Sequence, residues 1–333
     1  MNKRYILPAL IFIIILALAM IGYTSQSTQK AAVMPPLRVV PTISVNQLSR
    51  PVNTGAISYS VNVTNESFPA RLPYYAINQA NTTQSVFNRF SFVLGVSGQN
   101  ETIHGSRGAY LSTTDGPKSL IVSDNPLYFS YEEATLSGAR ISQNTIYYQQ
   151  ATLAKLQTLD VLPKPLVLSS PTYQFMNPQG TDPNATSNAN GATVAQIDYG
   201  VSLDGYRVYV GDADSPAYSA RFDGANRLVE LGGYVFPTIR KSNEDIAVIS
   251  YDEAVGRLQN NEGVLSSATP TEYSVAYLNP AILQSVQVRS AALGFFYSPA
   301  LPSLVPVYVF RGTSSVQEIP GPIDTTTIVS AIP

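Results

Sequence analysis

Few side chains in this sequence could act as catalysts, because the residue types that most often do chemistry are scarce. The chain has a single histidine, His104, and no cysteine. Thiol nucleophiles, thiolate metal sites and a multi-histidine zinc site are therefore excluded, and Ser-His-Asp hydrolysis is disfavoured. His104 lies in the polar segment NETIHGSRGAY, where the sequence offers it neither a nucleophile nor an orienting acid. We interpret it as a solvated loop residue.

Two acidic motifs echo each other 120 positions apart, FSYEEA at 129–134 and ISYDEA at 249–254. Each contains Ser-x-x-Glu, the spacing of a capping box. In this motif the serine hydroxyl accepts a hydrogen bond from the backbone amide of the third helical residue, and the glutamate side chain accepts one from the backbone amide of the serine. We therefore predict that a helix begins at each motif and that the chain holds two related units. The residues that form the two predicted caps are Ser130, Glu133, Ser250 and Glu253.

Other acids suggest turns rather than catalysis. Asp204-Gly205 and Asp223-Gly224 are strong hairpin signals. Asp212 and Asp214 could offer oxygens to calcium, but the further ligands and glycine of an EF-hand are missing. No glycine-rich phosphate loop is present. We expect no enzyme activity, no cofactor and no metal, although a pair of carboxylates for glycoside cleavage is a spatial arrangement that sequence does not reveal.

Tyrosine is abundant, with 21 residues, while tryptophan is absent. Exposed aromatic rings can stack on sugars or anchor protein contacts, whereas in β-strands tyrosine also serves in cross-strand packing. The packing interpretation is favoured, and a binding surface is the alternative. The tyrosines concerned are Tyr199, Tyr206, Tyr209, Tyr218 and Tyr234.

The elements that carry these residues follow a predicted membrane anchor. Residues 5–23 contain no charge and would form a helix of roughly 28 Å, close to the thickness of a bilayer core. Lys3 and Arg4 precede this segment, which predicts a cytoplasmic stub at 1–4 and an extracytoplasmic carboxy-terminal part in a single-pass cytoplasmic-membrane protein. A cleaved signal peptide is the alternative. Residues 24–56, rich in Pro, Ser and Thr, are interpreted as a spacer.

Two α+β units are predicted beyond the spacer. The first covers 57–193, with strands at 87–96 and 118–122, a helix at 143–159 and a polar loop at 177–193. The second covers 194–333. It has hairpins across 201–231, a capped helix from 250, and strands at 273–278, 285–297 and 304–310. The expected architecture is an antiparallel sheet with a packed helix in each unit.

The second unit resembles the PepSY-like fold of the YycH/YycI type, found in extracytoplasmic accessory proteins of two-component systems. The likeness rests on the hairpin pair (201–231), the Ser-Tyr-Asp-Glu-Ala helix entry (250–254) and the closing stretch ALPSLVPVYVFRGTSS (300–315). It covers roughly 190–333, and 60–190 in outline. The resemblance implies a final edge strand at 325–331 and a repeated unit. It also implies a noncatalytic protein, anchored by one helix, that binds a sensor kinase or another envelope component.

Charge argues against nucleic acid as a partner. Charged residues make up 13% of the chain, and its net charge is −2. Absence of cysteine suits a prokaryotic exported protein. The sequence therefore predicts a membrane-anchored regulatory or interaction protein of the cell envelope, with a protein partner in the membrane. The alternative is a surface polysaccharide-binding or carboxylate-dependent glycan-modifying protein.

Overall fold

The structure is a computed structural model that describes residues 56–63, 67–78, 81–105, 108–124, 126–177, 191–270, 283–316 and 319–333. The predicted span 5–23, nearly all of the spacer, most of the polar loop and the expected strand 273–278 lie outside the described residues. Within the described part, no helix is both long enough and apolar enough to cross a membrane. All described residues belong to one unit, Met34–Pro333.

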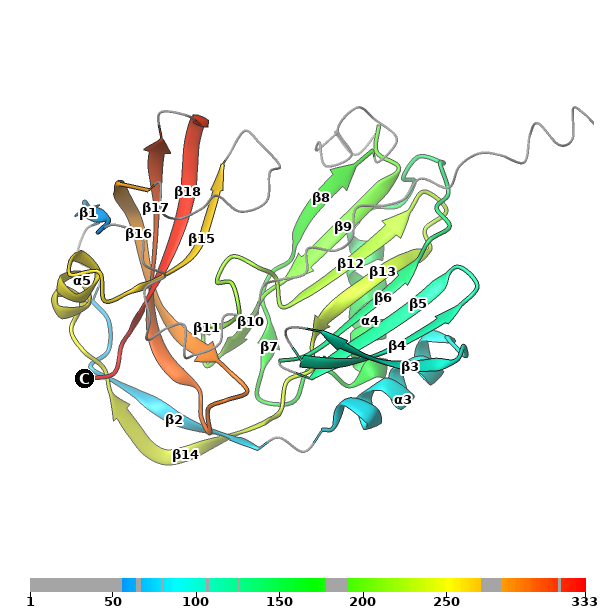
Figure 1. Cartoon of the computed structure of the whole chain (residues 1–333), viewed down its shortest axis with the longest axis horizontal. Helices are drawn as coiled ribbons and strands as arrows, with labels where there is room; N and C mark the ends of the chain where they lie inside the picture. The colour runs from blue at the N-terminus through cyan, green and yellow to red at the C-terminus, as the bar shows by residue number, and fades with distance from the viewer. Residues whose placement is uncertain are drawn as a thin grey trace, which may run out of the picture. The chain divides into compact units, whose positions relative to one another are not determined.

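The α+β prediction is confirmed: the described residues form two large, mostly antiparallel sheets and three helices. Sheet I, in the left half of Figure 1, places its longest strands side by side, and a short strand, β1, pairs with β16. Only β1 and β11 run parallel to β16. In spatial order its strands are β15 (Val264–Pro270), β18 (Ile319–Ser330), β17 (Val305–Val316), β16 (Ser285–Tyr297), β11 (Tyr206–Val210), β10 (Val201–Leu203) and β7 (Val167–Leu168), with β1 spanning Ser58–Val61.

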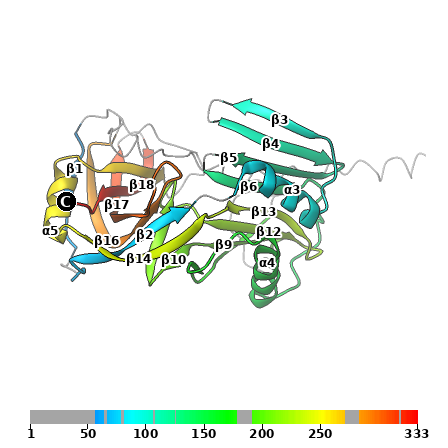
Figure 2. The ribbon, with the colours of Figure 1, turned by 90° about the horizontal axis from the view of Figure 1, so that it is seen from below.

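Sheet II is antiparallel throughout and carries helices α3 (Thr83–Leu94) and α4 (Thr145–Leu159) on one face (Figure 2). Its core lies under these helices, where Phe90 meets Phe129 and Tyr148 meets Phe222. In order, the strands are β3 (Asn100–Gly105), β4 (Gly108–Asp115), β5 (Lys118–Asp124), β6 (Leu127–Glu133), β13 (Leu228–Tyr234), β12 (Tyr218–Asp223), β9 (Val194–Tyr199) and β8 (Thr172–Met176).

A two-stranded ribbon, β2 (Arg71–Asn78) with β14 (Thr238–Ala247), completes the fold. Helix α5 (Tyr251–Gln259) packs beside β1 and β18 of sheet I. Its Tyr251 ring contacts Phe68 and Tyr308. Each sheet is therefore in contact with at least one helix.

The predicted strand at 87–96 is wrong, because this segment forms most of helix α3. Its buried side chains, Val86, Phe87, Phe90 and Leu94, recur at helical spacing rather than every second residue. Thr82 caps the amino end by accepting from the Ser85 amide, and Gly95 ends the helix with a φ of 65°. The predicted helix at 143–159 is confirmed as α4, which begins after its cap Asn144.

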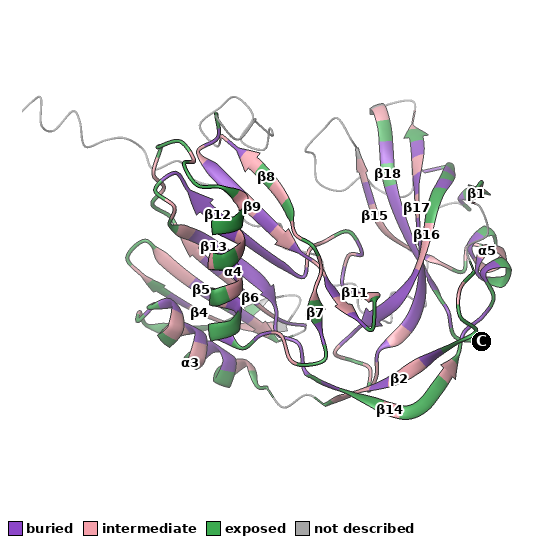
Figure 3. Cartoon of the chain, turned by 180° about the vertical axis from the view of Figure 1, so that it is seen from behind, coloured by how far each residue is buried: buried purple, intermediate pink, exposed green. Residues whose placement is uncertain are grey.

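The sheets do not follow the expected boundary at residue 193. Strand β9 lies between β8 and β12, and β13 pairs with β6, so both predicted units contribute to sheet II. The two predicted hairpins form, but β10–β11 belongs to sheet I and β12–β13 to sheet II. The expected edge strand at 325–331 is also wrong, because β18 lies between β15 and β17. Figure 3 shows burial running through β12 and β13, in the middle of sheet II.

Candidate functional site

Of the two predicted caps, only the second forms. Ser250 is the N-cap of α5 and accepts from the Glu253 amide at 3.1 Å. The Glu253 carboxylate does not reach back but pairs with Arg257 at 2.9 Å. Ser130 and Glu133 lie in strand β6, so the prediction of a helix there is wrong. Leu127, Phe129 and Tyr131 are buried at every second position, and this alternation fixes β6 as a strand of sheet II.

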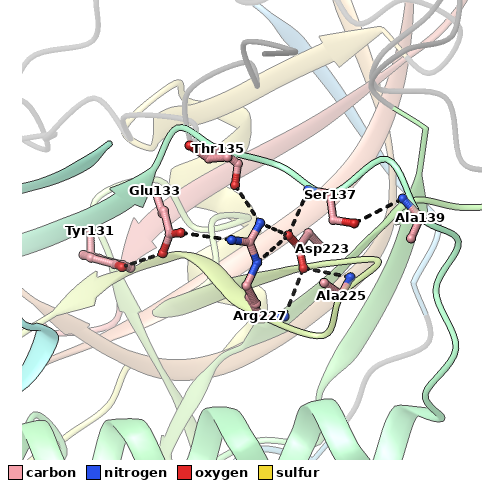
Figure 4. Close-up of polar contacts among 8 residues, drawn as sticks. All are labelled: Tyr131, Glu133, Thr135, Ser137, Ala139, Asp223, Ala225 and Arg227. Atoms are coloured by element: carbon pink, nitrogen blue, oxygen red, sulfur yellow. Dashed lines mark hydrogen bonds and ion pairs between the residues drawn. The ribbon is translucent and has the colours of Figure 1, made fainter. Parts of the chain in front are cut away.

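Glu133 instead contributes to a polar cluster around Arg227 (Figure 4). The Arg227 guanidinium donates to Asp223 at 2.7 Å, to the Thr135 carbonyl at 3.0 Å and to Glu133 at 3.4 Å. Asp223 is fully buried and also accepts from the Ser137 amide. The cluster ties the β12–β13 turn to the segment after β6, which indicates a structural role for its carboxylates.

The tyrosine cluster is core, not surface. Tyr199, Tyr209, Tyr218 and Tyr234 are each no more than 3% exposed. Tyr206 is half-buried, edge-on to Phe295. The packing interpretation is therefore confirmed, and the alternative of a tyrosine-rich binding surface is wrong.

His104 is exposed, but it lies in strand β3 opposite Ala109 rather than in a loop. The pairing of His104 with Ala109 is next to the pairing of Gly105 with Gly108 in the β3–β4 hairpin. In the part of the chain that the structure describes, no group of three or more His, Cys, Asp or Glu side chains could hold a metal.

Four polar side chains form a row across the face of sheet II that is opposite the helices; Arg221 and Glu230 are buried, and Gln196 and Asp198 are half-buried. Gln196 donates to both oxygens of Asp198, and Arg221 donates to Gln196 at 2.8 Å and to Glu230 at 3.1 Å. Burial and the neighbouring Glu132 outweigh the attraction of Arg221 and raise the pKa of Glu230 to about 7. Burial also raises the pKa of Asp198. Two carboxylates, Asp198 and Glu230, lie in this row, but Glu230 is only 1% exposed and is paired with Arg221, so it is not accessible to a substrate.

An open site is present in a hollow of about 480 Å³ over β15, β18, β17 and β16 of sheet I, which we call the sheet I hollow. It combines two arginines and two aspartates with several hydroxyls. No aromatic side chain is among the described residues that line it. Its lining consists of Asp214, Ser267, Thr269, Arg289, Ser290, Arg311, Gly312, Thr313, Asp324, Thr325 and Thr326.

Two β-bulges lie in the strands that form this hollow, and the extra residue of one of them, Arg289, is part of its lining. Val288 pairs with Gly312 and Ser290 with Arg311, which leaves Arg289 as the extra residue of β16. Ser266 is likewise extra in β15, where it donates to Asp212 and accepts from the Ala213 amide. Bulges redirect side chains and are common beside functional sites. A methyl group added at Gly312 would lie 2.4 Å from the Gln287 carbonyl oxygen, so the bulged strands approach closely only because this residue is glycine.

The two arginines of the hollow differ in their pairing. Arg311 donates to Asp214 at 3.1 Å and lies 6.0 Å from the Tyr209 ring centroid. Burial opposes ionisation of Asp214, but hydrogen bonds from Ser267 and Thr326, with the charge of Arg311, hold its pKa below the usual value. Asp214, considered above for calcium, is thus occupied by internal donors.

Arg289 and Asp324 are exposed, and neither side chain has an ion pair or hydrogen-bond partner among the described residues. They are the two charges of the hollow left for a ligand. Sequence reasoning missed them, although a signal exists. Val286 and Val288 alternate with polar residues, and the consecutive polar residues Arg289 and Ser290 then break this alternation, which indicates an extra residue in the strand.

No protein family matches the chain, and no curated protein sequence matches it.

Proposed function

We propose that the protein is a noncatalytic, membrane-anchored regulatory or interaction protein of the cell envelope. In this proposal residues 5–23 span the membrane, and the described part works on the extracytoplasmic side. The α+β architecture has mostly antiparallel sheets with helices packed against them. It is compatible with two PepSY-like units in which strands of both units pair within sheet II. The partner would be a membrane protein such as a sensor kinase, as in the YycH/YycI-like proteins that the second region resembles.

One observation supports the proposal: three carboxylates that could do acid-base chemistry are each paired with an arginine of the fold, while the open hollow presents two charges without a partner among the described residues. Asp223, Glu230 and Asp214 each hold an internal arginine. Arg289 and Asp324 face outward without partners among the described residues. An arginine held on a rigid sheet suits recognition, because its guanidinium fork matches a carboxylate and does not titrate. This pattern favours binding over catalysis.

The test is chemical crosslinking of the full-length chain in intact native membranes, followed by mass spectrometry of what co-purifies. We expect one membrane protein in near-stoichiometric amount, lost when residues 5–23 are replaced by an unrelated apolar span. The matched control keeps the span and replaces only the spacer 24–56 with a polar sequence of equal length.

Recovery of wall polymer alone, unaffected by the exchange of the span, would overturn this proposal. It would support the alternative of a surface polysaccharide-binding protein, whose binding should persist without the anchor.

A further inference from the structure

We propose that the sheet I hollow binds an extended, mixed-charge peptide segment of the partner, with an acidic side chain on Arg289 and a basic one near Asp324. This inference rests on the proposed function and names the chemistry of its contact. The unpaired Arg289 is the main determinant, since charge-assisted bidentate bonds to a carboxylate are among the strongest polar contacts in proteins.

The charge of the hollow selects among oxyanions. Its lining has two arginines and two aspartates, so it is formally neutral. A doubly charged phosphate would meet Asp214 and Asp324 as well as the arginines, and like charges in one site repel. A singly charged carboxylate beside a cation satisfies Arg289 and Asp324 together.

The spacing of the two unpaired charges fits a strand-like ligand. Arg289 is on β16 and Asp324 on β18, with β17 between them. Two inter-strand distances place their backbones roughly 10 Å apart. Residues i and i+2 of an extended peptide are about 7 Å apart on one face, and the length of the side chains covers the difference. The segment expected is therefore Asp or Glu two residues from Lys or Arg.

A sugar is the less suitable occupant. Saccharide sites commonly use exposed aromatic rings as stacking platforms, and the described lining has none. The ring of Tyr209, which Arg311 and Arg207 approach, is buried. Hydroxyls of Thr269 and Thr313 line the hollow as secondary hydrogen-bond partners for a peptide backbone.

The experiment places a photo-crosslinking amino acid at Ser290, an exposed residue of the lining, in the full-length chain within native membranes. The expected adduct is a protein segment with an acid and a base two residues apart. Combined with Arg289→Gln, the yield should fall by at least about tenfold, the loss expected for a charge-assisted pair. Asp324→Asn should reduce it less. The matched control, Arg240→Gln on exposed strand β14, should leave the yield unchanged.

Adducts with glycan or lipid, or protein adducts whose yield ignores Arg289→Gln, would overturn the inference. Failure of the inference and failure of the proposed function are distinguishable. If the span-dependent partner is recovered by general crosslinking but Ser290 does not reach it, the hollow is not its binding site. If no span-dependent partner is recovered, the proposed function itself falls. Thermal unfolding of each variant confirms that folding is unchanged, as expected for exposed, unpaired side chains.

Discussion

Glu230 lies between a residue that lowers its pKa, Arg221, and one that raises it, Glu132, on the two neighbouring strands of sheet II. Arg221 of β12 donates to one of its oxygens, while the other oxygen is buried without a hydrogen-bond partner among the described residues. Glu132 of β6 is directly opposite. A carboxylate in this position is more easily protonated than in water, because desolvation and a like charge both disfavour its ionised form. The pKa of about 7 therefore makes Glu230 a proton acceptor of the folded state.

Stability should consequently fall as pH rises from about 5 to 7. The folded chain binds the Glu230 proton up to about pH 7, whereas the unfolded chain releases it near 4.5. Across this window the folded state binds more protons, so raising the pH lowers the free energy of unfolding, by up to about 3 kcal/mol. Glu230→Gln should flatten this slope. The measurement is urea unfolding of the full-length chain in detergent, followed by tyrosine fluorescence.

The control for this titration is Glu244→Gln on β14, an exposed glutamate that should leave the slope intact. An unchanged slope in Glu230→Gln would show that another group titrates in this range.

At the scale of elements, local sequence signals were reliable where they described one helix or one turn. Helix α4 and the hairpin turns at Asp204 and Asp223 formed as predicted, because caps, helical spacing and Asp-Gly turns act over a few residues. The helix predicted at the FSYEEA motif was wrong, because Ser-x-x-Glu is also compatible with a strand whose alternate residues are buried. Segment 87–96 misled for the opposite reason: a run of aromatic and β-branched residues favours strand in isolation, but tertiary packing of Phe87 and Phe90 stabilises a helix.

The two echoing serines should therefore respond differently to the same substitution. Ser250→Ala removes the hydroxyl that accepts from the first turn of α5 and should lower the free energy of unfolding by about 1 kcal/mol. Ser130→Ala, in strand β6, removes no capping bond and should change it by less than about 0.5 kcal/mol. Both variants are compared by urea unfolding. Equal losses would contradict the assignment of the cap to α5 alone.

At the scale of the whole molecule, sequence could give the fold class but not which strands share a sheet. Strand pairing is decided by long-range packing, and the strands of 57–193 and 194–333 interleave in sheet II. The sheet I hollow could not be predicted either, because its lining comes from β15 to β18 and from the loop that holds Asp214. Only the consecutive polar residues Arg289 and Ser290, which break the alternation of β16, indicated the bulge. Arg289 gained significance from its place as the extra residue of a β-bulge, not from any motif.

Because strands of 57–193 and 194–333 pair with one another in sheet II, we predict that the segment 194–333 does not fold alone. It would contain β9, β12 and β13 of sheet II without β3 to β6 or β8, and would expose the buried Tyr199 and Tyr218. Its amide proton spectrum should be poorly dispersed, while that of 56–333 should be well dispersed. A cooperatively unfolding 194–333 segment would restore the boundary at 193 as a domain boundary.

Strand β1 has a mechanical consequence. Ser58–Val61 pairs in parallel with Ser285–Val288, the stretch of β16 that ends one residue before Arg289. This is the first described strand after the predicted span, so any tension on that span would reach sheet I through it. A pull along the strand would load its inter-strand hydrogen bonds together, in shear, rather than one at a time. If residues 5–23 span the membrane, tension on them would enter sheet I at Ser285, within the four residues of β16 that precede Arg289.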